Sequence, residues 1–156
     1  TYFNPNTQQA EPDIRQRIFE QYMHQLGLLD SDLVFSEGNV SVTTGKILAQ
    51  QILNKFGPDH LPAGLFIGSD PIAVGVLQVF NNAGIVVPRD TALISVNNLE
   101  LAKYLSPPLS TFNISVDDET RMAVNMLVDA LAGMRTTPKF VCHMGAELVL
   151  RQSFTG

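Results

Sequence analysis

The sequence has few of the residues that build disulfides, metal sites and membrane spans. Its single cysteine, Cys142, excludes an internal disulfide, and its three scattered histidines offer no metal-ligand spacing, so neither a metal nor another cofactor is expected. No apolar run approaches the roughly 20 residues of a membrane span, and residues 1–25 lack the basic start and apolar middle of a secretory signal. We therefore expect no membrane contact and a cytoplasmic protein.

Basic residues are also scarce. The 156 residues include 10 lysines and arginines against 15 acidic residues, which gives a net charge of −5. A nucleic-acid-binding domain usually carries a basic face, so this chain is not expected to bind DNA by itself. The 45% apolar content and modest charge fit an ordinary globular domain with a sizeable core. Thr1 stands where a complete chain would begin with methionine, so the sequence is interpreted as a fragment.

Apolar runs separated by turn residues predict an α/β fold with a parallel sheet. Residues 65–67 and 93–96 are nearly uniform apolar runs, interrupted only by Ser95, a pattern typical of parallel strands that helices cover on both faces. One helix of residues 71–83 joins them, so the two strands should be neighbours in the same sheet. Further strands are predicted at residues 33–35, 109–114, 139–143 and 147–150, and further helices at residues 12–26, between Thr44 and Gly57, and at 116–131 after an N-cap at Ser115.

Polar residues follow both apolar strands, at the edge where ligands of parallel α/β sheets bind. Ser69 and Asp70 come after the first strand, and Asn97 comes after the second. Asp70, directly before Pro71, is expected to cap the next helix. Ser69 is then either a cap of the same helix or a ligand contact.

An ordered series of short motifs covers most of the chain. It comprises Arg15-Gln16-Arg17-Ile18-Phe19 with Tyr22, the turn of residues 38–45, the strand and helix of residues 66–77, the turn of residues 83–88, residues 94–98, the Pro107-Pro108-Leu109-Ser110-Thr111 crossover and residues 147–153. This series resembles the effector-sensing domain of the lactose/galactose repressor family of bacterial transcription regulators. The resemblance implies a periplasmic-binding-protein-like α/β fold with a parallel, doubly wound sheet, and no enzymatic activity.

The resemblance also implies a division of the chain. Residues 1–112 would form the second effector-sensing subdomain, residues 113–137 a crossover and a helix of the first subdomain, and residues 138–156 the returning strands that complete the sensing domain. The helix would lack most of its packing partners. The family's amino-terminal helix-turn-helix has no counterpart in the sequence, so operator DNA would be bound only through a missing DNA-binding domain.

In the family that the chain resembles, a small effector binds between two subdomains, and five positions match that site. Arg15 resembles the effector-binding arginine, whose donors suit neighbouring sugar hydroxyls; a surface ion pair is the alternative. Ser69 falls where an asparagine often binds the effector, and Asn97 replaces an aspartate that commonly binds two hydroxyls. Val40 and Ile114 stand where an aromatic ring and a polar contact are usual, so they would either make the site more apolar or belong to the core.

Two helices carry more apolar residues than a surface helix needs. The helix at residues 12–26 places Ile14 and Ile18 beside Arg15, so we expect it to be buried. The helix at residues 71–83 is apolar around nearly its whole circumference, so either a neighbouring helix or a second subunit should cover its outer side. The resemblance favours a homodimer, with an interface that includes Pro71, Val74, Gln78 and Leu105.

These expectations describe the ligand-sensing and dimerising part of a transcriptional repressor. Its effector would be a small sugar-like molecule, with a galactoside favoured, while a purine or another small polar metabolite stays open. One alternative is a sugar-binding protein of a transport system, which shares the fold but is normally exported and monomeric. An α/β enzyme is the other alternative, disfavoured because the sequence has no nucleophile elbow, phosphate-binding glycine loop or His-Glu metal motif.

Overall fold

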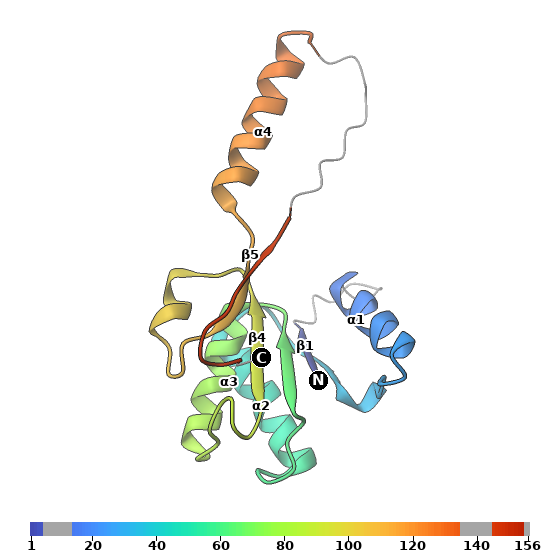
Figure 1. The fold of residues 1–156 in the computed structure, drawn as a ribbon, viewed down its shortest axis with the longest axis vertical. Coiled ribbons are helices and arrows are strands. Elements are labelled where there is room, and N and C mark those ends of the chain that lie inside the picture. Colours follow the sequence, from blue (N-terminus) through green and yellow to red (C-terminus); the bar gives the residue numbers. More distant parts are fainter. Residues whose placement is uncertain (5–13, 135–144, 155–156) are drawn as a thin grey trace.

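The chain forms a mostly parallel sheet with helices on both faces (Figure 1). The structure is a computed structural model that describes residues 1–4, 14–134 and 145–154. In chain order the elements are β1 (Tyr2–Asn4), α1 (Ile14–Gln25), η1 (Ser31–Leu33), β2 (Val34–Ser36), α2 (Val42–Phe56), β3 (Gly64–Ile67), α3 (Asp70–Asn82), β4 (Ala92–Val96), η2 (Glu100–Tyr104), β5 (Ser110–Asn113), α4 (Val116–Leu131) and β6 (Glu147–Val149).

The sheet has six strands in the order β2-β1-β3-β4-β5-β6. Strands β1 to β5 pair in parallel, and β6 pairs antiparallel with β5 at one side of the sheet. Leu65 of β3 lies opposite Leu93 of β4, which confirms the prediction of adjacent parallel strands. β1 has no counterpart among the predicted strands, because its three residues are too few to show a periodicity. The strand predicted at residues 139–143 lies outside the described residues.

The core lies between the sheet and the helix pair α2 and α3. Leu65 and Ile67 of β3 and Leu93 of β4 are buried in it. Burial alternates along most of β3 and β4, so these strands are tightly covered on this face only. Phe66 and Ile94 are half-buried on the other face. Helices therefore cover both faces, as expected, but α1 covers the second face only in part.

Helices α2 and α3 approach each other closely at two glycines. A Cβ atom at Gly75 of α3 would lie 2.0 Å from the Val42 carbonyl oxygen, and one at Gly45 of α2 would lie 2.0 Å from the Ile72 carbonyl oxygen. Only residues without a side chain permit backbones this close. Because α2 packs on α3 along this contact, a neighbouring helix within the chain accounts for much of the all-round apolar character of α3.

Helix α1 packs on the second face of the sheet through Phe19. The Phe19 ring centroid lies 5.1 Å from that of Tyr2 on β1 and 6.4 Å from that of Phe66 on β3. Ile14 and Ile18, however, are 53% and 56% exposed, and α1 contains no buried residue. The prediction of a buried α1 is wrong, since apolar spacing identified the helix but only part of its apolar surface packs against the described residues.

Helix α4 spans the residues predicted for it and projects away from the sheet (Figure 1). Ser115 is its N-cap, as expected, and its Oγ accepts a hydrogen bond from the Asp118 N–H at 3.3 Å. The predicted apolar stripe, which includes Met122 and Met126, is not buried in this chain. The expectation that the packing partners of α4 lie in another subdomain stays a prediction. None of the described helices is long and apolar enough to span a membrane.

One serine after β6 joins the amino ends of β4 and β5. The Ser153 Oγ donates to the carbonyl oxygen of Leu93, 60 residues earlier, at 2.7 Å and accepts from the Ser110 N–H at 2.8 Å. The Ser153 backbone N–H donates to the Pro108 carbonyl at 2.9 Å, and its carbonyl accepts from the Leu93 N–H at 2.8 Å. We name this fully buried contact the Ser153 bridge.

Candidate ligand site at the carboxyl edge of the sheet

The five predicted ligand residues follow the carboxyl ends of five neighbouring parallel strands. Val40 follows β2, Arg15 follows β1, Ser69 follows β3, Asn97 follows β4 and Ile114 follows β5. These strands lie side by side in the order β2-β1-β3-β4-β5, so the topology brings all five residues to one edge, which we name the carboxyl edge. Ligands of parallel α/β sheets bind at this edge.

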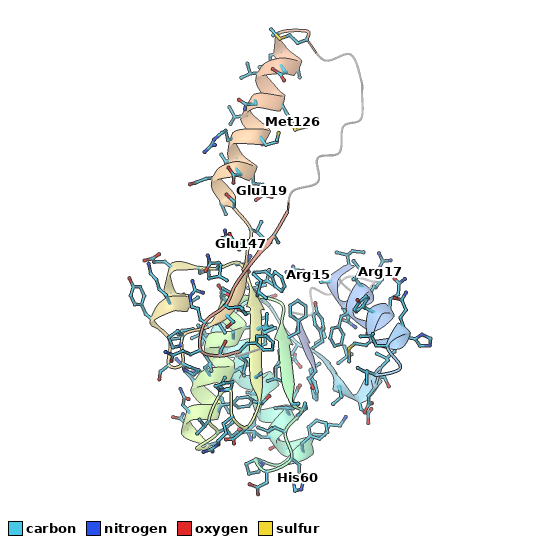
Figure 2. All side chains as sticks on the ribbon, in the orientation of Figure 1. Arg15, Arg17, His60, Glu119, Met126 and Glu147 are labelled. Atoms are coloured by element: carbon cyan, nitrogen blue, oxygen red, sulfur yellow. The ribbon has the colours of Figure 1, made fainter. Side chains whose placement is uncertain are left out.

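Arg15 reaches the carboxyl edge from the first turn of α1 (Figure 2). Its Nη1 donates to the carbonyl oxygen of Gly68, 53 residues away in the sequence, at 2.9 Å. Gly68 directly precedes Ser69, so this bond places the guanidinium next to the end of β3. The arginine side chain is exposed, which leaves part of its planar array of donors at the surface of the edge.

Neither Ser69 nor Asp70 caps α3 through its side chain. Ser69 occupies the N-cap position of α3, but its side chain makes no capping hydrogen bond. Ser69 is only 5% exposed, and within the described residues its Oγ has no hydrogen-bond partner. Buried hydroxyls are normally paired, so this one is a candidate for a ligand contact. Asp70 is the first residue of α3, and its predicted capping role is wrong because its carboxylate bonds elsewhere.

The Asp70 carboxylate connects α3 to the two strands beside it. It accepts hydrogen bonds from Ser95 Oγ on β4, from Thr111 Oγ1 on β5 at 2.8 Å and from the Leu99 N–H at 2.7 Å. Asp70 is fully buried, so these protein donors replace the water that would otherwise solvate the charge. The carboxylate thus fixes the ends of β4 and β5 relative to the start of α3.

The turn of residues 97–99, which follows β4, has an unusual backbone. Asn97 has φ of +112° and Asn98 has φ of +51°, and asparagine adopts positive φ more readily than most residues. The Asn97 N–H donates to the Phe112 carbonyl of β5 at 2.9 Å. Asn97 is exposed, and its side-chain amide has no partner within the described part of the chain. The backbone is therefore held while the amide stays available at the carboxyl edge.

Val40 and Ile114 flank the carboxyl edge and are not core residues. Val40 is 53% exposed and Ile114 is 38% exposed, so the alternative that places them in the core is wrong. Both therefore present apolar surface at the carboxyl edge.

The residues expected at a dimer interface lie on or near α3. Pro71 and Val74 are half-buried and Gln78 is exposed, whereas Leu105 is half-buried against the core. The Asn81 Nδ2 donates to the Ser106 carbonyl at 3.1 Å, which brings the segment around Leu105 next to α3. These positions therefore stand close together on the less buried side of α3.

The carboxylates with shifted pKa values are surface residues in ion pairs. The side-chain hydrogen bond from Arg89, helped by the Val86 N–H, lowers the pKa of Asp90 to about 2. Asp90 precedes β4 and so lies at the opposite edge of the sheet. The hydrogen bond from Lys103 lowers the pKa of Glu100. Among residues 1–4, 14–134 and 145–154, no group of three or more histidine, cysteine, aspartate or glutamate residues could hold a metal ion.

Asn98 and Arg151 lie beside the site but are not among the predicted ligand residues. The Arg151 Nη2 donates to the Asn98 Oδ1 at 2.8 Å, and 53 residues separate them. An asparagine pair after an apolar strand is a weak sequence signal for Asn98. Nothing in the sequence near Arg151 indicates its partner, because the contact depends on the return of the chain along β5.

The fold and this edge define a ligand-binding α/β domain. Residues 1–154 match the family model described as a periplasmic binding protein-like domain. The chain is 41% identical over 153 residues to the HTH-type transcriptional regulator GanR of Bacillus subtilis (strain 168), an alignment that covers 98% of this chain and 46% of GanR. It is 40% identical over 144 residues to the HTH-type transcriptional regulator LacR of Lactobacillus helveticus, with coverages of 92% and 42%. A solved LacI family regulator from Lactobacillus casei with bound glucose has a TM-score of 0.79 at 25% identity, with coverages of 97% and 54%.

The chain belongs to the periplasmic-binding-protein-like effector domains of LacI/GalR family transcriptional regulators. The family and the mostly parallel α/β fold predicted from the sequence are thereby confirmed. The chain spans less than half the length of these two curated relatives.

Proposed function

We propose that this chain is the ligand-sensing and dimerising part of a bacterial transcriptional repressor that responds to a small sugar-like effector, with a galactoside favoured. The main support is the hydrogen bond from Arg15 to Gly68, the residue before Ser69, whose buried hydroxyl has no partner in the part of the chain that the structure describes. The named relatives are transcriptional regulators, and the solved L. casei relative carries glucose. These likenesses favour a regulator over a transport protein.

The chemistry of the carboxyl edge suits an uncharged polyhydroxyl ligand. The arginine offers donors only, a serine hydroxyl donates and accepts, and an asparagine amide has two donors and an acceptor. Neighbouring sugar hydroxyls can satisfy all of these groups. Val40 and Ile114 would then contact the apolar faces of the sugar ring, in place of an aromatic ring at Val40.

The rest of the regulator would lie outside the described residues. Operator DNA would be bound by a helix-turn-helix that this chain does not contain, and the protein would act in the cytoplasm, where its operator is. Residues 1–112 would form one effector-binding subdomain and α4 part of the other. Support for this division comes from α4, which projects from the sheet without a buried residue.

Arg15→Ala in the full-length regulator is expected to weaken effector binding more than an alanine substitution of Ser69 or Asn97. Loss of a charge-assisted hydrogen bond removes about 1.5–3 kcal/mol, or roughly tenfold to more than a hundredfold in affinity. Calorimetric titration with galactose, lactose and glucose measures the change for each sugar that binds the parent. Arg89→Ala, at the opposite edge, is the matched control and should bind like the parent. Unchanged binding of such a sugar by Arg15→Ala would contradict the role proposed for the arginine.

Val74→Lys is expected to convert a dimer into monomers, because it places a charge in the proposed interface on α3. Sedimentation of the full-length protein at several concentrations reports the mass. Gln50→Lys adds the same charge to the exposed side of α2 and should leave the dimer intact. Equal masses for the parent and Val74→Lys would rule out this surface as the interface.

A further inference from the structure

A network of polar groups lies behind the carboxyl edge and joins the candidate site to the strands that connect the sheet with α4. β5 leads into α4, and β6 runs back toward the sheet beside β5 (Figure 1). We name β5 and β6 the crossover strands. The turn of residues 97–99 lies next to them, because β4 pairs with β5.

Asn98 is the junction between this turn and the crossover strands. Its backbone N–H donates to Thr111 Oγ1 at 3.2 Å, and its side-chain Nδ2 donates to Asn113 Oδ1 at 3.2 Å, both on β5. Its Oδ1 accepts from Arg151 Nη2 at 2.8 Å. The side-chain amide thus contacts β5 on one side and the segment after β6 on the other.

Arg151 is itself fixed to β5. Its Nη1 donates to the Leu109 carbonyl at 2.7 Å, its backbone N–H donates to Ser110 Oγ at 2.8 Å, and its carbonyl accepts from the same hydroxyl at 3.1 Å. A planar guanidinium held by two of its nitrogens has a defined orientation. The arginine is therefore a rigid support for Asn98.

The backbone of the turn requires such a support. Asparagine tolerates the φ of +51° at Asn98 better than most residues, but the φ of +112° at Asn97 is sparsely populated, and such values persist where surrounding contacts over-determine them. The Asp70 carboxylate holds Leu99 at the end of the turn, and Arg151 holds Asn98 in its middle. Asn97, whose side chain is available at the carboxyl edge, lies directly before these two anchored residues.

We propose that Arg151 is a positioning residue for the effector site, which acts through Asn98 to hold Asn97 in place relative to β5 and β6. The ligand part of this proposal rests on the proposed function. Arg151 does not contact the effector. Because this network joins Asn97 to the crossover strands, an effector that binds Asn97 also favours the arrangement of the crossover strands that holds Asn97 in place.

The first test is independent of any ligand. Amide hydrogen exchange of residues 96–101 is compared in the full-length parent, Arg151→Met and Arg89→Met, the last changing an exposed arginine at the opposite edge. Arg151→Met should exchange about tenfold faster in this segment, the size of one lost charge-assisted hydrogen bond. The α2 and α3 amides should keep their protection, and Arg89→Met should match the parent. An unchanged segment, or equal loss of protection in α2 and α3, overturns the proposal.

Two further variants separate positioning from general destabilisation. Arg151→Lys keeps one charged nitrogen in place of the two that bond Leu109 and Asn98, so the exchange rate of the segment should fall between those of the parent and Arg151→Met. Asn98→Gly removes both side-chain bonds while glycine accepts the positive φ, so it should loosen the segment even if Arg151→Met does not fold. If Asn98→Gly exchanges like the parent, the junction assigned to Asn98 is wrong.

The last test links the network to ligand binding. Galactose, lactose and glucose are titrated into each full-length variant, and any sugar that binds the parent should bind Arg151→Met about fivefold to thirtyfold more weakly. Equal affinity for the two proteins overturns the link to the site. If the parent binds none of these sugars, the sugar effector of the proposed function fails, while the exchange experiment still decides whether Arg151 positions the turn.

Discussion

Gly75→Ala is expected to destabilise the folded chain by about 3 kcal/mol, the upper part of the range for overpacked cores. The new Cβ would lie 2.0 Å from the Val42 carbonyl oxygen and 2.8 Å from the Lys46 nitrogen, both of them backbone atoms of α2. A flexible side chain could move aside, but a helix backbone cannot, so α2 and α3 must separate. Their separation exposes the apolar surface that both helices bury against the sheet.

Urea-induced unfolding of the full-length protein, followed by circular dichroism, measures this loss. Gly64→Ala is the matched control, because a Cβ there meets nothing closer than the Ala92 carbonyl oxygen at 3.9 Å and the φ angle is not positive. The control should retain the stability of the parent. A Gly75→Ala protein as stable as Gly64→Ala would show that the two helices do not pack as described.

Asp70→Ala is expected to cost about 3 kcal/mol of folding free energy. The substitution leaves the hydroxyls of Ser95 and Thr111 and the Leu99 N–H without their acceptor in a buried place, and each unsatisfied group costs about 1–3 kcal/mol. The hydroxyls can rotate toward other acceptors and the removed charge no longer has to be buried, so the total is less than the sum. The Leu99 N–H has no such freedom.

Comparison with Asp70→Asn separates the effect of the carboxylate's charge and acceptors from the effect of the side chain's shape. The amide keeps one acceptor oxygen but places a donor where the carboxylate accepts, so its stability should lie between those of the parent and Asp70→Ala. Asp59→Ala, in an exposed loop, controls for the loss of a negative charge and should have little effect. Equal stability of Asp70→Ala and Asp59→Ala in chemical denaturation would contradict the role of Asp70 in joining α3 to β4 and β5.

Local patterns predicted the regular elements well where each element carries its own signal. The helix at residues 116–131 has an N-cap serine and acidic residues in its first turn, and its observed bounds match the prediction. The burial of α1 was predicted wrongly, because periodicity shows which face is apolar but not what covers it. The apolar character of α3 raised the same question, and Gly45 and Gly75 show that α2 packs on one side of it, while Val74 and Gln78 stay less buried on another.

The candidate site was predictable to the extent that topology alone determines it. Arg15, Ser69 and Asn97 lie at one edge because the carboxyl ends of parallel strands lie at the same edge of the sheet. Their binding roles remain predictions. The contacts of Asp70 and Arg151 could not be predicted, since each depends on side-chain directions between segments far apart in the sequence, and no local spacing encodes those.

The Ser153 bridge has a consequence for the synthesis of the protein. A ribosome releases Leu93 and Ser110 well before Ser153, so the amino ends of β4 and β5 emerge without the residue that joins them. The β4–β5 ladder can form without Ser153, but the Leu93 carbonyl and the Ser110 N–H wait for the later segment, and contacts between such distant residues form slowly. During translation, the amino ends of β4 and β5 therefore lack two of their native hydrogen-bond partners until residue 153 has left the ribosome.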